Sequence, residues 1–160
     1  MKALLSLVLI IAAVSAFGKD APVTRSEAAS VFAKTDKAMN SVLHFRKAPA
    51  PFTAGAGVAS RGLILEHLYA VYEASVPLFK FTAPPFKSAP DVLAFKGAEK
   101  NLALKMEVLG FIDRYGPLAT SKADGLTPRE FGDTVGYFMA RIAELTHTPS
   151  AKYSPYLAPG

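Results

Sequence analysis

The sequence predicts an all-α domain, a small bundle of four to five helices with long Pro- and Gly-rich connections. In four segments, apolar residues recur at steps of three and four, the period of one helical face. Two of these segments open with Thr-x-x-Glu, the pattern of a capping box. No two segments alternate apolar and polar residues in a way that predicts paired strands. With 160 residues, 51% of them hydrophobic, the chain has the length and apolar content of a single domain.

The first helix is predicted to begin behind Thr24. The Thr24 hydroxyl can accept a hydrogen bond from the backbone N–H of Glu27, and the Glu27 carboxylate can accept one from the backbone N–H of Thr24. Residues 45–58 contain two prolines and two glycines and therefore predict a loop. The residues that share one face of the first helix are Ala28, Val31, Phe32, Thr35 and Met39.

The second helix is predicted from Ser60 to about Ser75, because Pro77 follows its end. Residues 76–86 contain three prolines, which favours an extended surface segment over a strand. A short helix is expected at Pro90, with Ser88 near its cap. The apolar face of the second helix comprises Ile64, Leu65, Leu68, Val71 and Tyr72.

The third helix is predicted over residues 98–109, with Gly110 as its stop. A loop flanked by turns follows, and the last helix begins at a second capping box, Thr127-Pro128-Arg129-Glu130. We expect residues 148–160 to form an extended tail that packs its tyrosines loosely or not at all. The core face of the last helix comprises Phe131, Val135, Phe138, Ile142 and Leu145.

The N-terminus has the pattern of a signal peptide over residues 1–18. Lys2 precedes an apolar run over residues 3–17, and small residues at 14–16 suit a cleavage site, with 16–18 as a second choice. A membrane anchor is the alternative, but the run is shorter than the ~20 residues that span a bilayer. We therefore expect export to the periplasm, the cell surface or the medium, with membrane contact only through an uncleaved signal.

Charge and cysteine content exclude several classes of function. The chain has 18 Lys and Arg against 13 Asp and Glu, and no run of five like charges, which argues against nucleic-acid binding. Removal of residues 1–18 takes away Lys2 alone among these charges, which leaves 17 − 13 = +4. Because there is no Cys, disulfides, thiolate nucleophiles and zinc–thiolate sites are excluded.

The sequence carries no enzyme motif, and we expect a non-catalytic protein without cofactor or metal. His44, His67 and His147 stand alone, with no second ligand at a metal-binding spacing, so surface or capping roles are expected. Their convergence in a hydrolase site remains an alternative. The aromatic residues of segment 78–95 could either stack on sugars or pack in the core.

Two segments resemble the S-layer homology domain, whose repeats end in a Thr-Arg-Ala-Glu-like motif that opens a helix. Val23-Thr-Arg-Ser-Glu-Ala28 is similar to that motif, and Leu126-Thr-Pro-Arg-Glu-Phe131 resembles it with an inserted proline. Residues 86–145 would form one unit, residues 19–40 the end of another, and Ser60-Arg61-Gly62 a degenerate third. The family's usual Trp is absent and its Gly-rich turn is poorly matched.

The resemblance implies a module, here spanning residues 19–147, that binds anionic cell-wall polysaccharide without catalysis. In that family the motif arginine contacts the polymer, which points to Arg25, Arg129 and Arg61 in this chain. The alternative is an exported helical domain that binds a protein partner through its aromatic segment 78–95 and its tail.

Overall fold

The computed structural model describes residues 20–158, and the regular structure among them is helical apart from two isolated bridges. Three long helices dominate: α2 (Arg25–Leu43), α3 (Arg61–Ser75) and α6 (Pro128–Thr146). The predicted all-α fold is therefore confirmed. The shorter elements are η2 (Val76–Leu78), η3 (Pro90–Val92), α4 (Gly97–Val108), α5 (Pro117–Thr120), η4 (Ser150–Lys152) and α7 (Ser154–Leu157).

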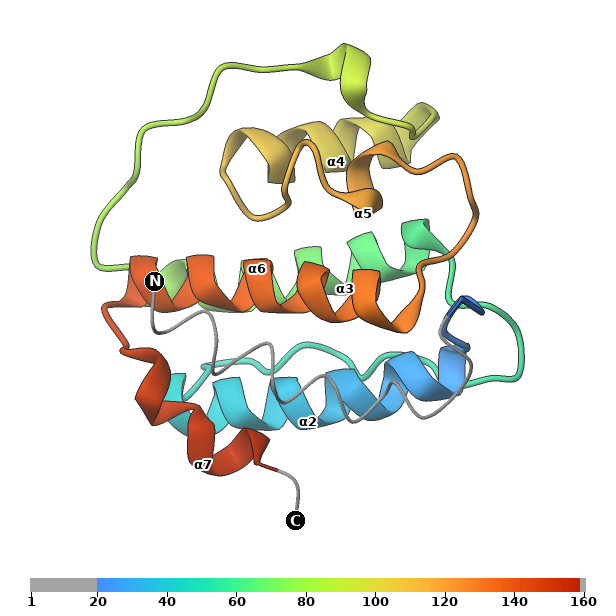
Figure 1. The fold of residues 1–160 in the computed structure, drawn as a ribbon. Coiled ribbons are helices and arrows are strands. Elements are labelled where there is room, and N and C mark those ends of the chain that lie inside the picture. Colours follow the sequence, from blue (N-terminus) through green and yellow to red (C-terminus); the bar gives the residue numbers. More distant parts are fainter. Residues whose placement is uncertain (1–19, 159–160) are drawn as a thin grey trace.

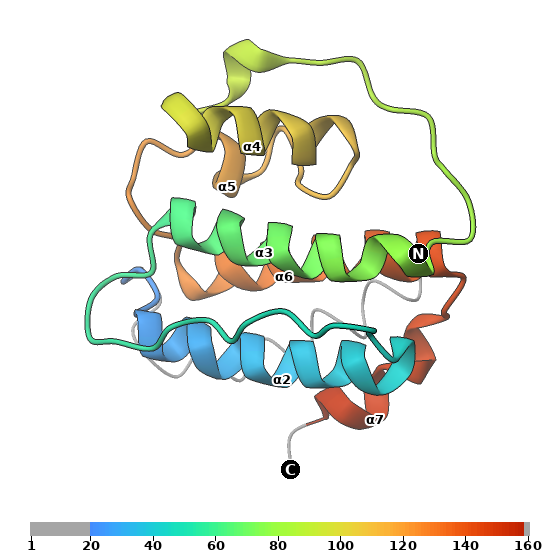
Figure 2. The same ribbon diagram turned by 180° about the vertical axis from the view of Figure 1, so that it is seen from behind.

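The helices form three layers. Helices α3 and α6 lie side by side in the middle, with α4 and α5 on one side and α2 and α7 on the other (Figures 1 and 2). The three long helices run parallel and begin at the same end (Figure 1). Helices α3 and α6 are therefore each reached by a connection that returns along the bundle.

The helix ends agree with the local signals in the sequence. Gly110 follows α4 with a φ of 78°, a left-handed conformation that glycine adopts without a steric penalty. The N–H of Gly110 donates to the carbonyl of Glu107, and the N–H of Phe111 donates to that of Met106. These two bonds form a Schellman motif, so the predicted stop at Gly110 is confirmed.

The core lies between the layers and is built mainly from aromatic and long aliphatic side chains. Phe32 and Phe131 meet edge to face at 5.3 Å, which joins α2 to α6. Phe111 and Phe138 pack at 5.8 Å and connect the segment after α4 to α6. The largest fully buried side chains also include Met39, Ile64, Leu65, Leu68, Met106, Leu126 and Ile142.

The prediction of an extended, loosely packed tail is wrong. Residues after Thr148 fold into η4 and α7, and α7 packs against α2. Tyr153 is 2% exposed and its hydroxyl lies 2.6 Å from that of Thr148. Pro149 and Pro155 do not break these helices, because they precede or occupy the first turn, where proline is tolerated. The tail therefore closes one side of the core, and of its tyrosines only Tyr156 stays exposed.

The connecting segments differ from expectation at three places. Segment 76–86 begins with η2, and Phe79 is half-buried against the core, whereas Phe81 and Phe86 are exposed. The short helix at Pro90 is a single 3-10 turn with Ala89 at the N-cap position and no side-chain cap. Helix α5 forms inside the predicted loop before α6.

The predicted signal peptide lies outside the described residues. Within residues 20–158, no helix has the length and apolar character needed to cross a membrane.

Candidate functional site

The starts of α2, α3 and α6 are tied together by backbone hydrogen bonds at one end of the bundle (Figure 1). The N–H of Val23 donates to the carbonyl of Leu126 at 2.8 Å, and the N–H of Ala59 donates to that of Val23 at 3.0 Å. The N–H of Arg61 donates to the carbonyl of Asp124 at 2.7 Å. The three helix starts that carry the predicted ligand-binding arginines therefore converge, although they lie far apart in the sequence.

Both predicted capping boxes are confirmed. The N–H of Thr24 donates to Glu27 Oε2 at 2.7 Å, and the N–H of Glu27 donates to Thr24 Oγ1 at 3.1 Å. Thr127 and Glu130 repeat this exchange at 2.8 and 3.3 Å, and Ser60 caps α3 through its hydroxyl. Because the caps occupy first-turn N–H groups, an anion at this end would be recognised mainly by arginine side chains.

Arg25 lies half-buried over the loop that precedes α3. A Cβ atom at Gly55 would come within 3.2 Å of the Arg25 guanidinium carbon, so the absence of a side chain at Gly55 lets the loop pass close to this cation. The N–H of Ser26 also donates to the carbonyl of Gly55, which holds the loop in place. Arg25 Nε is buried and has no hydrogen-bond partner among the described residues. Arg25 is therefore positioned by the fold while one of its donors remains unsatisfied.

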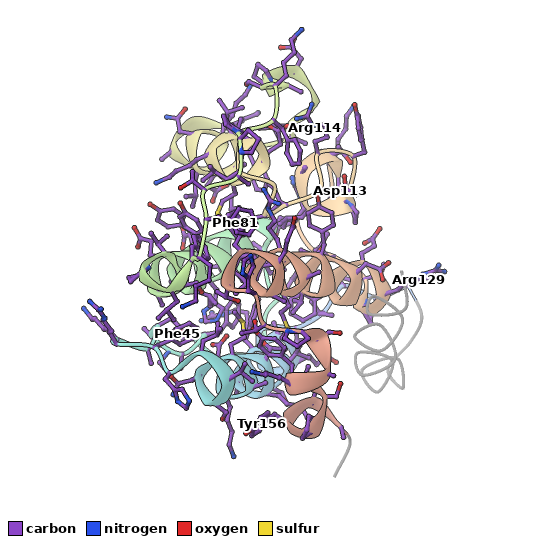
Figure 3. The ribbon with its side chains drawn as sticks, turned by 90° about the vertical axis from the view of Figure 1, so that its left-hand side faces the viewer. Phe45, Phe81, Asp113, Arg114, Arg129 and Tyr156 are labelled. Carbon is purple, nitrogen blue, oxygen red and sulfur yellow. The ribbon has the colours of Figure 1, made fainter. Side chains whose placement is uncertain are left out.

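Arg129 is the most accessible of the three arginines. It is exposed at the second position of α6, and its side chain points away from the bundle (Figure 3). Arg129 does not belong to the apolar face of α6, so its side chain is not needed for core packing. A cation in the first turn opposes the helix dipole, and a bound anion beside it would offset that cost.

Arg61 is not a surface residue, which corrects the expectation that it contacts a ligand. It is 7% exposed and its guanidinium donates to the carbonyls of Ala123, Leu118 and Ala94 at 2.7, 2.8 and 2.9 Å. Its guanidinium carbon also lies 4.6 Å from the centre of the Phe95 ring. Arg61 thus binds three connecting segments together and has a structural role.

The electrostatic environment of Arg61 agrees with this role. Burial lowers the pKa of its guanidinium, and the charges of Asp124 and Glu99 oppose that shift. Arginine nevertheless remains protonated at every physiological pH, so these carbonyls are held by a permanent cation.

The histidines lie in separate places. His44 and His147 end α2 and α6 in the left-handed conformation, with φ of 55° and 53°, which agrees with the expected capping roles. His67 departs from expectation because it is 6% exposed, with Nε2 2.8 Å from Asp36 Oδ2. His67 follows Ile64 by three residues and precedes Leu68 by one, and this position on the apolar face of α3 is the signal that indicates its burial.

The histidine positions do not form a shared site, and His67 packs 4.3 Å from Phe32 between ring centroids. Among residues 20–158, no group of three or more His, Cys, Asp or Glu side chains is arranged to hold a metal ion. Comparison of the chain with protein-family models, with curated proteins and with solved structures finds no match.

Proposed function

We propose that this chain is an exported, non-catalytic module that binds anionic polysaccharide of the cell envelope, as S-layer homology domains do. The observation that carries the proposal is the convergence of the three motif-bearing helix starts at one end of the bundle. The apolar run of residues 3–17 behind Lys2 supports the export that this function requires.

Arg25 and Arg129 are the proposed ligand-binding residues. Both lie in the first turn of a long helix, where their charge has no intrahelical advantage. A guanidinium recognises carboxylate or phosphate oxygens through paired hydrogen bonds, which suits the acidic groups of a wall polymer. Arg61 contributes from within by holding the segments that connect the helices.

Sedimentation with purified cell-wall sacculi tests the proposal. We expect the wild-type protein to pellet with sacculi and the Arg25→Ala/Arg129→Ala double variant to stay in the supernatant. The matched control is Arg46→Ala/Lys47→Ala, which removes two exposed cations beyond the other end of α2 and should pellet like the wild type. Equal recovery of the wild type and of the Arg25/Arg129 variant in the pellet would refute the assigned site.

A protein partner is the second candidate, favoured by the exposed aromatic rings of segment 78–95. Phe81 and Phe86 are 40% and 50% exposed, and each contacts a side chain at or near the end of α6. Recovery of one stoichiometric protein with the wild type, its loss with Phe81→Ala/Phe86→Ala, and the absence of bound glycan would favour this alternative.

A further inference from the structure

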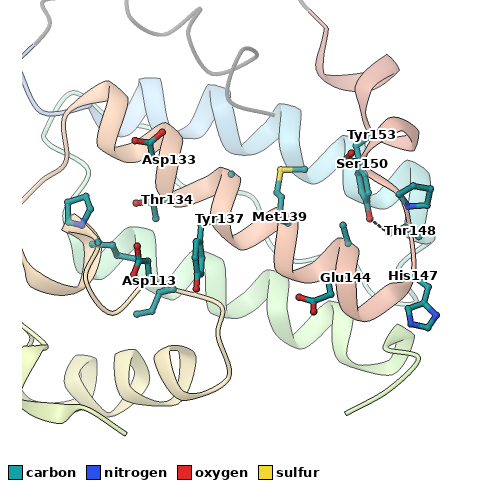
Figure 4. Close-up of a pocket in the computed structure, with 18 residues that line it drawn as sticks. Asp113, Asp133, Thr134, Tyr137, Met139, Glu144, His147, Thr148, Ser150 and Tyr153 are labelled. Carbon is teal, nitrogen blue, oxygen red and sulfur yellow. Dashed lines mark hydrogen bonds between the residues drawn. The ribbon is translucent and has the colours of Figure 1, made fainter. Parts of the chain in front are cut away.

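A groove of about 680 Å³ runs along a face of α6 that no long helix among residues 20–158 covers (Figure 4). Helix α6 forms its floor with Gly136, Met139, Ala140 and Ala143. One end is lined by Ile112, Asp113, Gly116, Pro117 and Leu118, and the other by His147, Thr148, Pro149, Ser150 and Tyr153. Its size lies within the range of about 300–1,000 Å³ that is common for small-molecule sites.

Gly136 deepens this groove, and no neighbouring side chain requires a glycine at this position. It lies in the middle of α6, where glycine costs about 1 kcal/mol relative to alanine. A Cβ atom added there would meet nothing within 4 Å, whereas one at Gly62 in α3 would collide with the Glu99 carboxylate. A side chain at Gly62 would displace the Glu99 carboxylate, whereas Gly136 leaves open space at the floor of the groove.

The charged side chains of the groove are acidic. Asp113, Asp133 and Glu144 line it, and none of its described lining residues is Lys or Arg. Arg141 pairs with Glu144 at 2.8 Å, so the negative charge is concentrated toward the end that holds Asp113 and Asp133 (Figure 4). Arg114, next to Asp113 in the chain, pairs with the buried Glu107 at 2.6 Å.

Tyr137 stands between the acidic end and the apolar floor (Figure 4). Burial raises the pKa of its hydroxyl, the charge of Asp113 adds to this, and Arg141 and Arg114 oppose it. Tyr137 therefore stays neutral at physiological pH and presents a ring edge with a polar tip, which suits contact with both ends of an amphiphile.

We propose that this groove binds a small amphiphile with a linear apolar body and a cationic, ammonium-type head. The body would lie along the small side chains of α6 between Gly136 and Ala143, and the head beside Asp113 and Asp133. Apolar burial supplies the affinity, and the excess of carboxylates selects the sign of the head group. The acidic end of the groove lies toward the start of α6, where Asp133 follows Arg129 by four residues, but neither Arg25 nor Arg129 lines the groove. The amphiphile proposal does not depend on the polysaccharide proposal.

Calorimetric titration of the full chain with three twelve-carbon amphiphiles tests the proposal, each kept below its micelle concentration. Dodecyltrimethylammonium should bind at one molecule per chain and at least about tenfold more tightly than dodecyl sulfate or dodecyl maltoside, a difference of about 1.4 kcal/mol. The Asp113→Asn/Asp133→Asn variant should lose this preference and retain binding of the neutral maltoside.

Gly136→Leu fills the groove and should abolish binding. The added Cβ atom meets no neighbour within 4 Å, and leucine has a higher helix propensity than glycine, so the variant should melt no lower than the wild type. Ala33→Leu, on the exposed surface of α2 and outside the groove, is the matched control and should bind normally.

Three outcomes would overturn the proposal. One is the absence of saturable one-to-one binding by the wild type. Another is binding by Gly136→Leu equal to that of Ala33→Leu, which would place the ligand elsewhere. The last is equal or tighter binding of the sulfate, which would exclude a cationic head group.

Discussion

Replacement of Arg61 by alanine removes the cation that holds three separate carbonyls, those of Ala123, Leu118 and Ala94. The bond to Leu118 is buried and the other two are partly buried. A buried carbonyl left without a partner costs about 1–3 kcal/mol, and a partly buried one less because water reaches it. The contact with the Phe95 ring adds about 1 kcal/mol.

We therefore expect Arg61→Ala to lower the free energy of unfolding by about 3–5 kcal/mol. Burial of the Arg61 charge, which lowers its pKa, costs the folded wild-type protein desolvation energy. The free energy lost in Arg61→Ala is therefore smaller than the sum of three charged hydrogen bonds. Arg61→Lys should lose about half as much free energy of unfolding as Arg61→Ala, because one ammonium group cannot reach three carbonyls as a planar guanidinium does.

Urea unfolding followed by circular dichroism measures these differences, provided that the slope with denaturant is unchanged. The matched control is Arg129→Ala, an exposed arginine at the start of α6, which should change stability by less than about 0.5 kcal/mol. A loss below about 1 kcal/mol for Arg61→Ala, or Arg61→Lys equal to the wild type, would refute the structural role of this residue.

Three further predictions concern local features. Gly110→Ala should cost about 1–2 kcal/mol in urea unfolding because the residue has a φ of 78°, and an unchanged midpoint would contradict the Schellman end of α4. Thr127→Ala should cost about 1 kcal/mol, and Glu130→Ala should lose less in that background than in the wild type, since the two share one capping box. Burial raises the pKa of Tyr153, with Thr148 opposing, so an unfolded tyrosine ionises near pH 10 while the folded one stays neutral. The stabilisation from the buried, neutral Tyr153 is present below about pH 10 and falls as the pH rises further. In urea unfolding between pH 9 and 11, Tyr153→Phe should therefore lose less free energy of unfolding than the wild type.

The helices could be predicted because their signals are local. A capping box spans three residues, as at Thr24 and Glu27, and a glycine stop acts within one turn, as at Gly110. The burial of Arg61 and His67 could also have been inferred, since both share the helical face of Ile64 and Leu68. What the pattern could not indicate is the partners of Arg61, which lie 33 to 62 residues away.

The tail and the groove depend on the arrangement of distant segments. The prolines near Tyr153 are compatible with both an extended chain and short helices, and packing on α2 selects the helices. The groove combines α6 with residues 112–118 and 147–153, so no single stretch of sequence contains its pattern. The two glycines inside the helical period of α6, Gly132 and Gly136, are the only local feature that bears on it, and the sequence does not show which of them faces the groove.

The parallel course of the long helices also governs when the fold can be completed during synthesis. Helical hairpins close as soon as their second helix is made, whereas here Val23 pairs with Leu126. The joined end of the bundle cannot form until most of the chain has left the ribosome. A nascent chain therefore remains open for longer than an antiparallel helical bundle of equal size.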